Sequence, residues 1–261
     1  MNWDRYNELV ALRDSGRIEE ATAEFDKLAE AETDPEIKAF TLLQVVNGLR
    51  FLKRSSDARR KIREASSILG PKHNDYIRVA LAAAILEIDQ ENWKGALRKL
   101  DGIVEKYTPL LHLDENKDVL EEVQRNRGIA LFELRRFREA RPVLESVRRV
   151  PYERERTLCS LGMCNFELKD VEAAKRDFEE LVSLQPRAVF RAYAYYHLGM
   201  IFYADGQLAR AKTEFEKCLA STDLGKISKD NLLQWIVNAC KGLNLKNEAL
   251  HYSEMLKTLL R

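Results

Sequence analysis

Few residues of this chain could perform acid–base or metal chemistry, and their spacing favours neither. The four histidines are far apart in the sequence: His73, His112, His197 and His251. Sequence signs of a catalytic site include a His-Glu-x-x-His segment, a glycine-rich phosphate loop or a nucleophile elbow. The chain contains none of these motifs. We therefore expect no metal, no cofactor and no catalytic residue.

The cysteines likewise form no site motif. There are four, Cys159, Cys164, Cys218 and Cys240, and all lie in segments predicted to be helical. None is spaced with a histidine as zinc ligands are. Reduced thiols that pack between helices are typical of cytoplasmic proteins. The first residues are charged, without an export signal, and the longest apolar stretch, residues 79–86, is too short to span a bilayer. We expect a cytoplasmic protein.

The charged residues indicate a solvated surface. Lysine and arginine number 43 against 42 acids, a net charge of +1, which favours neither nucleic acid nor membrane binding. Adjacent acids such as Glu179 and Glu180 point to different sides of a helix. Arginine-rich segments such as residues 135–138 alternate with glutamates. We predict that the protein is not an enzyme.

The strongest pattern is an internal repeat with a period of about 34 residues, the mark of a solenoid. It is clearest at Gly162 and Gly199, each followed twelve residues later by an alanine and, four residues after that, by Phe178 or Phe215. The alanine anchors recur through the chain at Ala21, Ala58, Ala96, Ala140, Ala174, Ala211 and Ala249. Small residues at such positions let two helices approach closely, and the large residues fill the space beside them.

This pattern resembles the tetratricopeptide repeat, W-x2-L-G-x2-Y…A-x3-F…P. The resemblance implies an all-α, right-handed superhelix of antiparallel helix pairs, A then B. It also implies one solenoid domain over residues 1–261. The predicted repeats lie near residues 2–35, 39–70, 77–107, 114–151, 155–187, 192–221 and 229–261.

One departure interrupts the register between Ala96 and Ala140, the widest step between anchors. The additional segment, Thr108 to Asp114, contains a proline and three leucines. We predict that it is a short apolar loop. Asp114 would then cap an N-terminally extended fourth A helix.

The resemblance also implies a binding surface, because the A helices of tetratricopeptide arrays line the inner face. Carried over residue by residue, the inward positions of repeats four to six hold the aromatic, methionine and arginine side chains that we predict to contact a partner. They are Arg125, Phe132, Arg156, Met163, Phe166, Tyr193, Tyr196, Met200 and Tyr203. The same register places Trp3, Phe40, Leu43 and Arg78 on the inner face of repeats one to three. The alternative is that these side chains pack between neighbouring A helices.

We therefore predict an adaptor or scaffold that binds a partner protein or peptide segment in the inner groove. Two alternatives remain open: a self-assembling structural protein and a peptide-sensing regulator. The C-terminal helix is apolar on more than one side, through Leu250, Met255 and Leu259. That face indicates an interface with a second copy or with the partner.

Overall fold

The computed structural model describes residues 3–260, which form helices joined by turns, with no strand. The chain divides into two compact units, with the boundary between Leu134 and Arg135. The first unit contains α1 (Trp3–Asp14), α2 (Ile18–Ala31), α3 (Pro35–Phe51), α4 (Ser55–Ile68), α5 (Tyr76–Asp89), α6 (Trp93–Leu111), the 3-10 turn η1 (Asp114–Asn116) and α7 (Lys117–Glu133). The second contains α8 (Phe137–Ser146), α9 (Arg154–Glu167), α10 (Val171–Ser183), α11 (Ala188–Ala204), α12 (Leu208–Leu219), α13 (Lys229–Gly242) and α14 (Lys246–Leu259).

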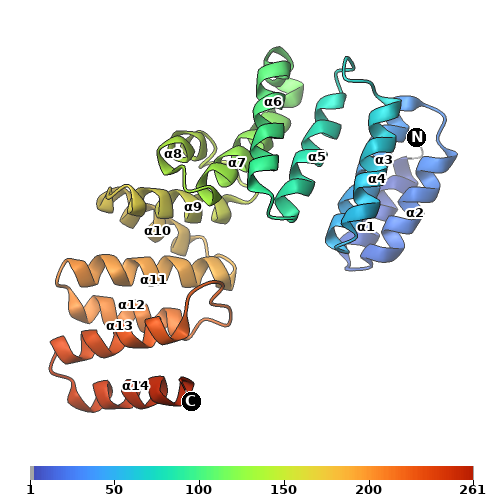
Figure 1. Ribbon diagram of the computed structural model, residues 1–261. Coiled ribbons are helices and arrows are strands. Elements are labelled where there is room, and N and C mark those ends of the chain that lie inside the picture. Colours follow the sequence, from blue (N-terminus) through green and yellow to red (C-terminus); the bar gives the residue numbers. More distant parts are fainter. Residues whose placement is uncertain (1–2, 261) are drawn as a thin grey trace. The chain divides into compact units, whose positions relative to one another are not determined.

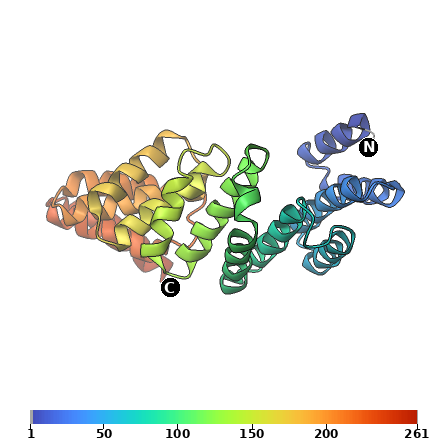
Figure 2. The same ribbon diagram turned by 90° about the horizontal axis from the view of Figure 1, so that it is seen from above.

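Within each unit, consecutive helices pack side by side in opposite directions (Figures 1 and 2). The all-α class and the antiparallel pairing are confirmed, and fourteen described α-helices agree with about seven repeats. The unit boundary falls between α7 and α8, inside the predicted fourth repeat. That the seven repeats form one domain stays a prediction.

The alanine anchors lie on the buried faces of the B helices. All of them are buried, and the most exposed, Ala249, keeps 7% of its surface. Phe178 and Phe215 are fully buried, and their rings lie across Gly162 and Gly199 of the preceding A helix. Each such ring contributes roughly 1.5–3 kcal/mol by leaving water. In each of these repeats, the glycine of the A helix and the phenylalanine of the B helix are therefore in direct packing contact.

The turns between A and B helices repeat as closely as the core does. The second residue after the end of each A helix has a positive φ, between 54° and 90°. These residues are Gly16, Lys53, Glu91, Arg135, Lys169, Gly206 and Asn244. After Glu91, for example, the next backbone amide donates back to the last turn of the helix, from Asn92 N to Glu87 O at 2.9 Å. This left-handed ending satisfies carbonyls that the helix leaves open. The B helix that follows therefore runs antiparallel to the A helix.

The prediction for residues 108–114 is wrong in its main part. The third B helix, α6, continues through Pro109 to Leu111, and only the following residues form a turn, η1. Non-helical backbone at Tyr107 marks a kink two residues before the proline. Tyr107 and Leu111 are buried, so packing keeps this segment helical despite the missing proline amide. Asp114 starts the 3-10 turn and does not cap α7, which begins at Lys117.

Candidate binding surface

An aromatic stack joins α9, α10 and α11 in the second unit. The His197 ring lies parallel to the Phe178 ring, with centroids 5.0 Å apart and an interplanar angle of 18°. Phe166 meets the same imidazole edge-on at 5.3 Å. Offset and edge-to-face geometries are the favourable ones for such rings. The Phe166 side chain, predicted to contact a partner, therefore also packs between two A helices.

The next repeat has the same arrangement with different residues. Trp235 of α13 lies parallel to Phe215, with centroids 5.9 Å apart and an angle of 18°. Tyr203 meets the indole edge-on at 5.0 Å. His197 and Trp235 were not among the predicted site residues, because the inward positions taken from the repeat family skip their place. Only their aromatic side chains could have identified them from the sequence. His197 lies two residues before Gly199.

His197 is neutral in this environment. Burial lowers the pKa of its imidazole below the ordinary 6.5. Its Nδ1–H donates to the carbonyl oxygen of Tyr193 at 2.8 Å, which leaves Nε2 unprotonated. The histidine therefore acts as a flat apolar ring that also ties down one helical carbonyl.

Tyr193 orders the connection between α12 and α13. Its phenol oxygen accepts a hydrogen bond from the backbone amide of Lys226 at 2.8 Å. Gly225, at φ +56°, lies so close that an added Cβ would be 2.8 Å from the same oxygen. The polar end of Tyr193 is therefore used within the protein, and its ring remains half-buried.

Five of the predicted side chains of the second unit form what we call the aromatic face. All of its members are half-buried and pack on the core of α9 to α14 while keeping part of their surface exposed. They are Met163 and Phe166 on α9, and Tyr196, Met200 and Tyr203 on α11. Methionine adapts its shape and aromatic rings give large contact areas, so this composition suits recognition of a partner.

The three other predicted residues lie in different surroundings. Arg156 of α9 is half-buried. Arg125 of α7 is 3% exposed and pairs with Glu122 at 3.6 Å, so its charge is used inside the first unit. Phe132, also on α7, is half-buried.

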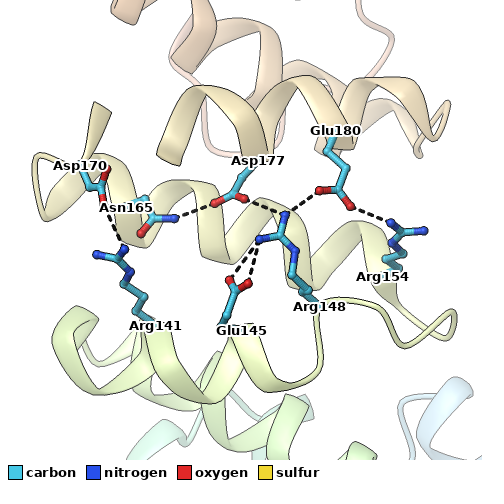
Figure 3. Close-up of polar contacts among 8 residues, drawn as sticks. All are labelled: Arg141, Glu145, Arg148, Arg154, Asn165, Asp170, Asp177 and Glu180. Atoms are coloured by element: carbon cyan, nitrogen blue, oxygen red, sulfur yellow. Dashed lines mark hydrogen bonds and ion pairs between the residues drawn. The ribbon is translucent and has the colours of Figure 1, made fainter. Parts of the chain in front are cut away.

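A polar network ties α8, α9 and α10 together (Figure 3). The Asp177 carboxylate is 3% exposed and accepts hydrogen bonds from Asn165 Nδ2 at 2.6 Å and from Arg148 Nη2 at 3.1 Å. The same guanidinium reaches Glu180 at 2.6 Å, and Arg154 binds the other oxygen of Glu180 at 2.6 Å. These bonds cross from one repeat to the next and fix how the B helices pack.

Within this network, the pKa values of Asp177 and Glu180 shift in opposite directions. Burial raises the pKa of Asp177, although Asn165 and Arg148 counteract it. Burial also acts to raise the pKa of Glu180, but hydrogen bonds from Arg154 and Arg148 outweigh it and lower that pKa. The opposed shifts come with fixed protein partners on both carboxylates, so they indicate a structural network.

Comparison with protein families decides the nature of the repeat. Residues 125–188 and residues 192–222 each match a model described as a tetratricopeptide repeat. The chain contains tetratricopeptide repeats. No curated protein matches it.

Solved structures share this fold at low sequence identity. The repeat protein is similar to Pseudomonas aeruginosa PilF, with 19% identity, a TM-score of 0.65, and coverage of 86% of this chain and 93% of PilF. It is also similar to PilW, a type IV pilus biogenesis factor, with 16% identity, a TM-score of 0.61, and coverage of 84% and 92%. The apo form of the quorum sensor NprR from B. thuringiensis matches with 16% identity, a TM-score of 0.65, and coverage of 97% and 73%. These similarities establish the fold alone.

Proposed function

We propose that this tetratricopeptide repeat protein is a non-catalytic scaffold that binds a protein or peptide segment across its aromatic face. The observation that carries the proposal is the partial exposure of Met163, Tyr196 and Met200 beside rings that are packed on the core. Stacking of Phe166 and Tyr203 holds the helices in place, so the face is preorganised for a partner. A general protein-interaction role agrees with the fold.

Substitution of the face tests the proposal. A pull-down from the source cells identifies the partner, and calorimetry then measures its affinity for single variants. Met200→Ala and Tyr196→Ala should each weaken binding by about 1–3 kcal/mol. The matched control is Glu179→Ala, an exposed side chain on the B helix α10, which should change affinity little. Equal losses from both sets would show that the partner does not use this face.

A cytoplasmic location belongs to the same proposal. All four cysteines are unpaired and buried. Burial raises the pKa of the Cys159, Cys164 and Cys218 thiols to about 12, so they stay protonated and unreactive. In residues 3–260 no helix is long and apolar enough to cross a bilayer. Fractionation of the source cells with compartment markers tests the location.

Self-association through α14 is a second candidate, favoured by its exposed leucines. Leu250, Leu259 and Leu260 are 58%, 47% and 70% exposed. Leu260, which directly follows α14, is the most exposed of the three. Light scattering should find a dimer for the wild type and a monomer for Met255→Lys combined with Leu259→Lys. A monomeric wild type would exclude the homodimer.

A further inference from the structure

The first unit contains an apolar pocket away from the aromatic face. Its walls are the side chains of Trp3 on α1, Ile37, Phe40 and Leu43 on α3, and Leu69 at the end of α4. Tyr6 stacks on Phe40 with ring centroids 5.7 Å apart. Trp3 is 59% exposed, so one wall of the pocket is an aromatic surface open to solvent.

The rim of the pocket is acidic. Glu36 and Asp75 contribute carboxylates that are 63% and 53% exposed. The His73 ring lies between them, with Nε2 3.1 Å from Glu36 Oε1, while its Nδ1 accepts the Asp75 backbone amide at 3.2 Å. This ring therefore holds the 70–75 connection beside α3 and keeps both carboxylates at the same edge.

Among residues 3–260, the one basic side chain that lines the pocket is already paired. Arg78 donates through both terminal nitrogens to the Asp118 carboxylate, at 2.9 Å and 3.4 Å. An occupant of the pocket therefore meets two carboxylates and no available guanidinium. The charge of the rim favours a cation beside the apolar group that fills the pocket.

The size of the pocket limits what it can hold. Its volume is about 220 Å³, below the 300–1,000 Å³ of typical small-molecule and cofactor sites. It suits one large side chain. An aromatic wall near two carboxylates also attracts the flanking lysine or arginine through cation–π and ionic contacts.

We propose that this pocket is a second binding site, and that its occupant is a partner segment presenting a large aliphatic or aromatic side chain next to lysine or arginine. The site goes beyond the proposed function because it lies in the other unit and has a charge preference that the aromatic face lacks. The exposed carboxylates set that preference, and Trp3, Phe40 and Leu43 hold the anchor.

Synthetic nine-residue peptides test the proposal by fluorescence anisotropy. The probe has a central phenylalanine between two lysines in a glycine–serine background, with both termini blocked. Two matched peptides replace the lysines by glutamates, or the phenylalanine by alanine. We expect the lysine–phenylalanine peptide to bind at least tenfold more tightly than either. Equal binding of the lysine and glutamate peptides, or binding of none, would overturn the proposal.

Charge reversal locates the binding on the protein. Glu36→Lys combined with Asp75→Lys should invert the preference towards the glutamate peptide, and Trp3→Ala should weaken both peptides at least fivefold. The control, Glu105→Lys with Glu115→Lys, makes the same charge change at exposed positions outside the pocket and should alter affinity less than twofold. A preference unchanged by reversal would show that the peptides bind elsewhere.

Two further readouts separate this site from the other assignments. Tyr196→Ala and Met200→Ala should leave the peptide affinities unchanged, so failure of the aromatic face and failure of the pocket are distinguishable. Light scattering tests whether a second copy fills the pocket. A wild-type dimer that the charge-reversed variant dissociates would overturn the proposal in favour of self-association.

Discussion

Phe178 lies across Gly162 so closely that a Cβ atom on that glycine would be 2.8 Å from Cε1 of the ring. The ring is fully buried. We predict that Gly162→Ala lowers the free energy of unfolding by about 1–3 kcal/mol, because overpacking forces the ring or the helix to shift. Urea denaturation followed by circular dichroism measures the change.

The matched control is Gly102→Ala in α6, where an added Cβ meets no atom within 4 Å. Alanine loses less backbone entropy on folding than glycine does, so this substitution should raise the free energy of unfolding by about 0.5–1 kcal/mol. A stabilised or unchanged Gly162→Ala would contradict the packing described for the repeat.

The left-handed turns after α1 and α5 can be compared by exchanging their residue types, glycine at position 16 and glutamate at position 91. Glu91 has φ 54° and Gly16 has φ 90° at equivalent positions of their repeats. Glu91→Gly should stabilise the protein by about 1 kcal/mol, since glycine adopts this conformation without a steric penalty. Gly16→Glu should destabilise it by a similar amount. Thermal unfolding of both variants checks the opposite signs, and shifts of the same sign would refute equivalent turns.

The network around Asp177 should respond strongly to loss of one partner. Asp177→Ala leaves the buried amide of Asn165 and part of the Arg148 guanidinium without their acceptor. We predict a loss of about 3–5 kcal/mol in the free energy of unfolding. Glu20→Ala removes an ion pair with Arg17 whose side chains are 52% and 60% exposed, so it should cost no more than about 1 kcal/mol. A similar loss of unfolding free energy for Asp177→Ala and Glu20→Ala would mean that the network contributes little to stability.

Stability should fall on mild acidification because of His197. The pKa of the folded imidazole is lowered by burial below 6.5, so the unfolded chain binds the proton more readily. The contribution of His197 is complete above about pH 6.5 and is lost as the pH falls through the folded pKa. His197→Phe keeps a stacked ring and should reduce the slope of unfolding free energy between pH 7 and 5.5. His112→Gln, at an exposed position, serves as the control. A slope that His197→Phe leaves unchanged would contradict the buried neutral ring.

The sequence predicted the elements whose packing depends on local spacing. The interval between Gly162, Ala174 and Phe178 reports a close contact of two helices, and the structure places all three residues in it. The segment after Tyr107 was predicted to be an apolar loop, but it is helical through Pro109 to Leu111. Burial of Leu111 outweighs the proline there, and burial is a tertiary property that local spacing does not report.

The candidate sites show a similar division. The register taken from the family resemblance pointed to A-helix positions that are half-buried in the structure, including Tyr196 and Met200. It left open whether these side chains pack between neighbouring A helices, as Tyr203 does on Trp235. It did not indicate that Arg125 is buried, because burial depends on the neighbouring helix. The acidic pocket depends on the 70–75 connection, where His73 meets Glu36 of a distant segment. A repeat pattern contains no such long-range information.

The most direct test of the central proposal is the affinity of the captured partner for Met200→Glu. Met200 is half-buried on α11 within the aromatic face, and a carboxylate there places a charge in the proposed contact. Calorimetry should find binding weakened at least a hundredfold, with an unchanged circular dichroism spectrum. Glu179→Lys on α10 should bind as the wild type does. Wild-type affinity for a folded Met200→Glu would contradict the proposed scaffold surface.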